Sequence, residues 1–197
     1  NGTSQISTAL RFGTLSVRYL IKLAVQWNEQ WLNELIWREF FMMILYHYPH
    51  VVHNSFKKKY DQIEWRNDEK EFEAWCRGET GYPIVDAGMR QLNETGLMHN
   101  RVRMIVASFL VKDLHLPWQW GAKFFMQHLV DGDSASNNHG WQWTAGTGTD
   151  ASPYFRIFNP ISQGEKFDPH GEYVRSWLPQ LRELDNSAVH APWTAGL

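Results

Sequence analysis

The chain of 197 residues contains a single cysteine, Cys76. One thiol cannot build an intramolecular disulfide framework or a cysteine-rich zinc site, and it favours a reducing compartment, which we take to be the cytoplasm. No apolar run reaches the length that spans a membrane, and the first residues lack the pattern of a signal peptide. These absences argue against a disulfide-stapled secreted domain and against a membrane partner.

The sequence also lacks an excess of charge of either sign. Its 19 Lys and Arg against 21 Asp and Glu give a formal net charge of −2. A uniformly basic nucleic-acid-binding surface is therefore excluded, whereas a local basic patch is not. Hydrophobic residues at 43% and charged residues at 20% argue against disorder. The length and the lack of a linker-like boundary predict one domain over residues 1–197, and we expect a monomer.

Strict alternation of apolar and polar residues, which marks half-buried strands, is missing as well. Apolar residues recur at helical spacing in long runs instead. These runs are 27–48, 84–96, 99–115, 118–130 and 171–184. We predict an all-α fold, a compact helical domain with little or no sheet. The segment 49–68 is a predicted polar loop, and the chain from residue 144 onward is predicted to be irregular.

Aromatic side chains are abundant: 11 Trp, 11 Phe and 7 Tyr make up 15% of the chain. A core alone rarely needs so many indoles, so a planar ligand or base stacking is indicated. Trp37 could stack on a base while Glu34 accepts a hydrogen bond from its polar edge. Equally, Glu34 and Arg38 could form an i,i+4 ion pair on a solvated face.

Two further segments have the chemistry of a ligand site. Residues 2–7 read GTSQIS just before an apolar run, which indicates either an anion site or an ordinary helix N-cap. Asp131 and Asp133 flank Gly132 and suggest a close approach to a ligand, and an ion pair between Asp131 and Arg103 is compatible with it. No histidine lies at ligand spacing beside these acids, so no metal site is predicted, and no nucleophilic triad is found.

Six segments in this order closely resemble the helical FAD-binding domain of the photolyase and cryptochrome family, and within it the class I bacterial cyclobutane pyrimidine dimer photolyases. They are GTSQIS (2–7), WLNELIWREFF (31–41), TGYPIVDAGMR (80–90), MHNRVRM (98–104), 131–143 and YFRIFNP (154–160). The resemblance covers essentially the whole chain and implies FAD held in the helical core. The family's N-terminal α/β domain is absent, so an antenna chromophore, folate or deazaflavin, is expected only in a full-length protein.

The resemblance also implies which residues bind the cofactor. They are Thr3, Ser4, Gln5, Ile6, Ser7, Trp31, Arg103, Asp131, Gly132, Asp133 and Asn137. The segment 3–7 corresponds to the part that holds the phosphates, and Asn137 to the residue that faces flavin N5. Asparagine at that position resembles repair photolyases, whereas plant cryptochromes typically carry Asp and animal ones Cys. Gln5 departs from the pattern, which commonly has a basic residue there, and Leu97 stands where an aromatic residue is common.

For the reaction, the resemblance implies a catalytic set and a DNA-binding set. The catalytic set is Glu34, Trp37, Asn137, Trp141, Trp118 and Trp65, of which the last three match an indole chain that carries an electron from the surface to the flavin. The DNA-binding set is Glu34, Trp37, Arg38, Asn100, Arg101, Met104, Trp143 and Arg156.

The expected partner is UV-damaged DNA, and the expected activity is light-driven repair of pyrimidine dimers by an electron from reduced FAD to a flipped-out dimer. Photolyases themselves are among the enzymes known to take their target base out of the stack. Two alternatives stay open: a cryptochrome-type flavin photosensor, and a non-catalytic helical DNA-binding module that has lost its flavin.

Overall fold

The computed structural model describes residues 3–149 and 157–196, and every regular element within them is helical. The predicted all-α fold is therefore confirmed. The α-helices of the described residues are α1 (Ser7–Arg11), α2 (Val17–Trp27), α3 (Glu29–His47), α4 (Glu69–Arg77), α5 (Pro83–Thr95), α6 (Asn100–Ser108), α7 (Trp118–His128), α8 (Ser134–Ala145), α9 (Pro160–Phe167) and α10 (Glu172–Trp177). None of the described helices is both long and apolar enough to cross a membrane.

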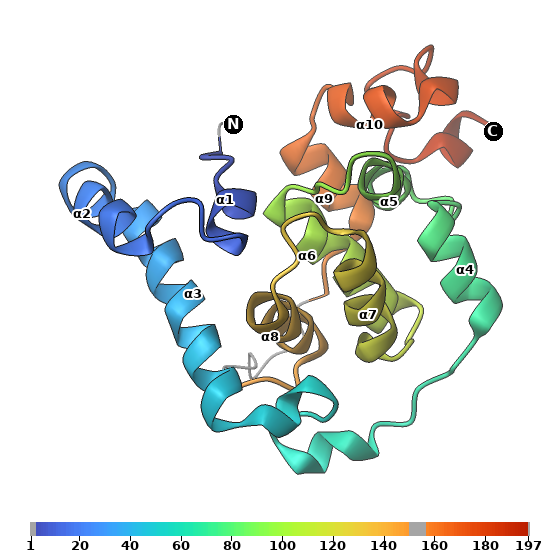
Figure 1. Cartoon of the computed structure of the whole chain (residues 1–197). Helices are drawn as coiled ribbons and strands as arrows, with labels where there is room; N and C mark the ends of the chain where they lie inside the picture. Colours follow the sequence, from blue (N-terminus) through green and yellow to red (C-terminus); the bar gives the residue numbers. More distant parts are fainter. Residues whose placement is uncertain (1–2, 150–156, 197) are drawn as a thin grey trace.

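Helix α8 lies in the middle of the molecule, with α3 on one side and α7 on the other (Figure 1). The main hydrophobic core gathers around α4 to α8, where Trp75 is completely buried. A second, much smaller core joins the first three helices and has only Leu20, Ala24 and Leu35 fully buried. Helix α8 contributes Trp141 and Ala145 to the main core and also contacts α3, whose first half belongs to the small core.

Several helix boundaries differ from the sequence prediction. The predicted run 171–184 ends at Trp177, because Pro179 has no N–H to continue the helix and begins the short turn η4 (Pro179–Leu181) instead. The run 99–115 continues past α6 as the π-helical turn η3 (Phe109–Asp113). The predicted loop 49–68 contains two 3₁₀ turns, η1 (Pro49–Val52) and η2 (Lys58–Gln62).

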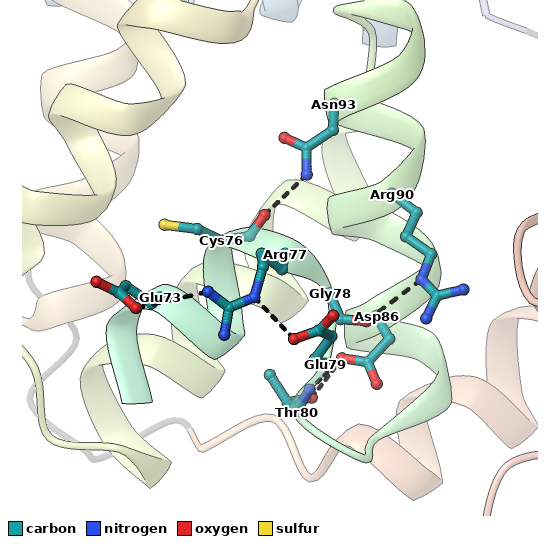
Figure 2. A network of polar contacts seen from close by, with 9 residues as sticks. All are labelled: Glu73, Cys76, Arg77, Gly78, Glu79, Thr80, Asp86, Arg90 and Asn93. Atoms are coloured by element: carbon teal, nitrogen blue, oxygen red, sulfur yellow. Dashed lines mark hydrogen bonds and ion pairs between the residues drawn. The ribbon is translucent and has the colours of Figure 1, made fainter. Parts of the chain in front are cut away.

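The turn between α4 and α5 is held by a polar network (Figure 2). Gly78 ends α4 in the left-handed region, with φ at +66°. The Asp86 carboxylate accepts hydrogen bonds from the Thr80 N–H, the Thr80 hydroxyl and the Gly81 N–H at 2.8, 2.6 and 3.0 Å. Burial nonetheless raises the pKa of Asp86 above its ordinary value. Cys76, at the end of α4, is also shielded, and burial raises the pKa of its thiol to about 12.

A buried amide network joins α8 to the segment that follows α3. The Val51 carbonyl accepts from Asn138 Nδ2 at 2.7 Å and from Gln142 Nε2 at 2.9 Å. Gln142 Oε1 in turn accepts from the Phe56 N–H at 2.9 Å. Gln142 is 1% exposed, so its amide depends on these partners for hydrogen bonding. The network therefore fixes how α3 and α8 lie relative to each other.

Helices α7 and α8 approach each other closely at Gly121. A Cβ atom at this position would lie 2.1 Å from the ring of Trp141, which is 2% exposed. The indole of Trp141 consequently rests directly on the backbone of α7.

We predict that Gly121→Ala destabilises the protein by about 1–3 kcal/mol, since the new methyl group must displace a large buried ring in a packed core. Gly140→Ala is the matched control, because an added Cβ there meets no atom within 4 Å. That substitution should leave stability unchanged or raise it by up to about 1 kcal/mol through helix propensity. Urea unfolding of both variants checks this, and equal stabilities would contradict the close approach.

Candidate functional site

Helix α3 carries the predicted lesion-binding residues. Asn28 caps it by accepting from the Trp31 N–H at 2.9 Å. Glu34 and Trp37 are exposed and three residues apart, so they project from nearly the same face. The alternative ion pair between Glu34 and Arg38 is wrong, because the Arg38 guanidinium binds the adjacent Glu39 carboxylate at 2.7 Å.

The indole of Trp37 is held by two neighbouring rings of the same helix. It stacks on Phe41 with centroids 5.7 Å apart and planes at 30°, and it meets Phe40 edge-on at 5.6 Å. The side chain is still 45% exposed. Trp37 therefore offers a supported aromatic surface to a planar ligand.

The predicted acidic turn lies between α7 and α8. Arg103 Nη2 donates to both carboxylate oxygens of Asp131, at 2.8 and 3.0 Å, and Arg103 Nε donates to the Met98 carbonyl at 2.8 Å. The predicted pairing of Asp131 with Arg103 is thus confirmed. Asp133 caps α8 by accepting from the Ser136 N–H at 2.9 Å.

An arginine that the sequence prediction did not include connects α1 to this turn. Arg11 Nε donates to the carbonyl of Gly132. The contact brings the predicted phosphate-binding segment 3–7, whose last residue begins α1, toward the acidic turn. No local pattern identifies Arg11, because its partner lies 121 positions away in the sequence.

The segment 3–7 does not cap α1 through a side chain. The N-cap position is Ile6, and no side chain accepts a hydrogen bond there, so the alternative of an ordinary N-cap is wrong. Ile6 and Trp31 instead pack against the small core. The hydroxyls of Thr3, Ser4 and Ser7 belong to exposed residues.

Asn137 lies on α8, and its side-chain amide is oriented by α7. Its Nδ2 donates to the Ala122 carbonyl at 2.9 Å. Within residues 3–149 and 157–196 no donor reaches the Oδ1 of the same amide, so a hydrogen-bond acceptor remains available. Exposed hydroxyls, a fixed ion pair and this acceptor form a donor and acceptor set that fits a flavin dinucleotide. In the same part of the chain, no group of three His, Cys, Asp or Glu side chains could hold a metal ion.

The start of α6 presents further predicted DNA-binding residues. Asn100 is exposed, and Arg101 and Met104 are half-buried. The Arg101 guanidinium lies 4.5 Å from the ring centroid of Phe167, which ties α6 to α9. Trp143 of α8 is half-buried and stacks with Phe158 at 6.4 Å. Arg156, the remaining predicted phosphate contact, lies outside the described residues.

The predicted electron-transfer indoles differ in burial. Trp141 and Trp118 are 2% and 1% exposed, whereas Trp65 is half-buried. Trp141 has ring contacts with Trp75 at 6.1 Å and with Phe125 at 5.1 Å. Ring contacts within the described residues do not join the three indoles directly, so the chain stays a prediction.

Comparison with known proteins identifies the family. Residues 31–197 match the family described as the FAD binding domain of DNA photolyase. The chain belongs to this family. As a photolyase FAD-binding domain, it is 52% identical to the deoxyribodipyrimidine photo-lyase of Vibrio cholerae over 203 residues, which cover 98% of this chain and 43% of the relative.

Solved structures show the same relationship. The archaeal photolyase of Sulfolobus tokodaii, crystallised with two FAD molecules, superposes with a TM-score of 0.95 at 45% identity over 100% of this chain and 45% of that one. The cryptochrome of Synechocystis superposes with a TM-score of 0.91 at 40% identity over 98% of this chain and 41% of that one. The photolyase domain described here thus spans less than half the length of these relatives.

We predict that Arg103→Ala lowers both stability and flavin retention. It leaves the Asp131 carboxylate, whose side chain is 5% exposed, without its cation, which costs up to about 3 kcal/mol. Thermal unfolding and the flavin absorbance after reconstitution with FAD check this. Arg77→Ala removes an exposed pair with Glu79 and serves as the control, with little change expected in either. Equal effects of the two substitutions would contradict the prediction.

His99 gives the start of α6 a pH dependence. Its Nδ1 accepts the Arg101 N–H at 3.1 Å, which requires an unprotonated nitrogen. Although His99 is exposed, partial desolvation at the helix start, followed by the charges of Arg101 and Arg103, lowers the pKa of His99 below its usual 6.5. The unfolded chain therefore binds this proton more readily. The stability that neutral His99 contributes is fully present when the pH is above the pKa of His99 in the unfolded chain. It is lost as the pH falls below that value.

We predict that His99→Asn, which caps without titrating, reduces the loss of melting temperature between about pH 8 and pH 5. His53→Asn, an exposed histidine at the end of η1, should not reduce it. If both variants keep the full loss, the cap at His99 does not respond to pH.

Proposed function

We propose that residues 1–197 are the FAD- and lesion-binding domain of a deoxyribodipyrimidine photo-lyase that repairs cyclobutane pyrimidine dimers in UV-damaged DNA. Family membership supports this. The observation that carries the proposal is the pairing of the half-exposed indole of Trp37 with the exposed carboxyl group of Glu34 on α3. The two provide a stacking surface and a polar group to one planar substrate.

When bound and reduced, FAD supplies the single light-promoted electron that opens the cyclobutane ring. In this proposal the hydroxyls of segment 3–7 hold its phosphates, and Trp31 borders its rings. The ion pair of Arg103 and Asp131 fixes the acidic turn, with Gly132 and Asp133, beside it. The free carbonyl of Asn137 accepts from its N5 edge. An antenna chromophore belongs to a full-length protein.

The dimer leaves the duplex before repair, as photolyase substrates do, and Trp37 stacks on it. A protonated Glu34 carboxyl group donates a hydrogen bond to a carbonyl oxygen of the dimer and stabilises the negative charge that develops there. Asn100, Met104 and Trp143 line the other walls of the pocket that receives the dimer. The cations of Arg38, Arg101 and Arg156 contact the flanking phosphates, which such a site needs because DNA affinity depends on them.

Trp141, Trp118 and Trp65 serve a separate purpose in the proposal, the resupply of electrons to an oxidised flavin. Their burial supports a path that runs from Trp65 near the surface to the other two indoles in the interior, since Trp65 is half-buried and the other two are buried. We further propose that the protein acts as a monomer in the cytoplasm.

A photosensor is the second candidate, favoured by the high similarity to the Synechocystis cryptochrome. Glu34 and Asn137 favour repair over signalling, because both match the photolyase pattern. Illumination of the reduced, FAD-reconstituted chain with a dimer-containing oligonucleotide tests the proposal, and chromatography measures the restored pyrimidines. Flavin photochemistry without repair would indicate the photosensor, and failure to bind FAD would indicate a DNA-binding module.

We predict that Trp37→Ala and Glu34→Ala impair different steps, DNA binding and repair respectively. Loss of the indole removes stacking worth roughly 1–3 kcal/mol per base and should weaken affinity for damaged DNA. Loss of the carboxyl group should lower repair per absorbed photon more than affinity, because it acts when the dimer gains charge. Binding assays and photon-counted repair assays separate the two effects.

Trp27→Ala is the matched control, because this indole of α2 is 79% exposed and lies outside the predicted site. It should change neither affinity nor repair yield. An unchanged yield in Glu34→Ala would show that Glu34 only faces solvent.

A further inference from the structure

A stack of three rings crosses the interface between α3 and α8. Trp37 stacks on Phe41 at 5.7 Å with planes at 30°. Phe41 also stacks with His139, with centroids 5.0 Å apart and planes at 19°. Both separations fall in the range in which aromatic rings attract one another. The outer ring of the stack is the surface assigned to the lesion, and the inner ring belongs to a different helix.

His139, the inner ring of this stack, is held in place by burial and by a hydrogen bond. Its ring is only 5% exposed. Its Nδ1 lies 2.9 Å from the Ala135 carbonyl oxygen, which can only accept, so this nitrogen donates. The backbone of α8 at this point is held by the buried amides of Asn138 and Gln142. The hydrogen bond to Ala135 therefore ties the imidazole to the backbone of α8.

Phe41 transmits this orientation to Trp37. The two residues are four positions apart on α3 and so lie one above the other on the same face. Phe41 is half-buried, whereas Trp37 is 45% exposed and is held by Phe40 and Phe41 of its own helix. A ring fixed from outside α3 thus anchors Phe41, one of the two rings that restrict the exposed indole.

We infer that His139 is a positioning residue for Trp37, acting through Phe41, and that it preorganises the stacking surface for the flipped base. The role in lesion binding rests on the proposed function, whereas the ring stack does not. A surface held in its binding orientation loses less side-chain freedom when the ligand arrives, so it binds more tightly. His139 touches neither substrate nor cofactor in this account.

The first test follows Trp37 directly and needs no DNA. The full chain is labelled with fluorinated tryptophan, and the fluorine resonance of Trp37 is assigned by its loss in Trp37→Phe. His139→Leu should shift this resonance toward that of a solvated, mobile indole, while the resonance of the exposed Trp27 stays in place. His139→Phe, which restores a ring without the imidazole nitrogens, should return the Trp37 resonance toward its original position.

The second test measures binding of oligonucleotides with and without a pyrimidine dimer. His139→Leu should reduce the preference for damaged DNA by about two- to tenfold, the effect expected from losing one aromatic pair. Affinity for undamaged DNA and flavin content should not change. His139→Phe should restore the preference. Phe41→Leu removes the middle ring without altering α8 and should reproduce the loss, which keeps the test decisive if a variant at 139 folds poorly.

His128→Leu is the matched control. His128 of α7 also stacks on a phenylalanine, Phe124, at 3.9 Å, and also contacts the carbonyl four residues earlier. It should leave both the Trp37 resonance and the DNA preference unchanged. Equal behaviour of His139→Leu and His139→Phe, or an unmoved Trp37 resonance in His139→Leu, would overturn the inference. If the parent chain shows no preference for damaged DNA, the proposed function fails, and the fluorine spectrum still decides whether the ring stack positions Trp37.

Discussion

The shared Val51 carbonyl, which accepts from both Asn138 and Gln142, determines how the two halves of the site meet. Trp37 and Glu34 stand on α3, whereas Asn137 and Trp141 stand on α8. Nothing in either helix alone fixes the separation between these groups. Buried amides tolerate little displacement, because an unpaired polar group inside a protein costs about 1–3 kcal/mol. The network therefore fixes the position of α3 relative to α8, and with it the contacts between these two helices.

Different faces of helix α8 contact different neighbours. Asn138 and Gln142, four residues apart, face the segment after α3, while Asn137 and Trp141, also four apart, face α7 through Ala122 and Gly121. His139 meets the ring of Phe41. Because α8 packs against α3, α6 and α7, the residues assigned to binding and the residues that pack are mixed along its sequence.

This mixing explains which features could be predicted from the sequence. Helical spacing identified α3 and α7, and opposite charge identified the pair of Asp131 and Arg103, because both signals are local or chemically specific. The supposed pair of Glu34 and Arg38 failed because Glu39, the adjacent residue, competes for the same guanidinium. Arg11 and His139 were missed because their partners are distant in the sequence, 121 positions away for Arg11. Only the tertiary fold brings such residues together.

The small core of the first three helices has a consequence for how a large dinucleotide reaches its place. With so little apolar area, and with one arginine contact from α1 to Gly132, α1 and α2 are the part of the fold expected to open first, whereas α3 is held on α8. Their opening exposes the segment 3–7 and Trp31 without unfolding the main core. Cofactor loading can then proceed through a sub-global fluctuation, so that exchange of backbone hydrogens in α1 and α2 becomes slower once the dinucleotide is bound.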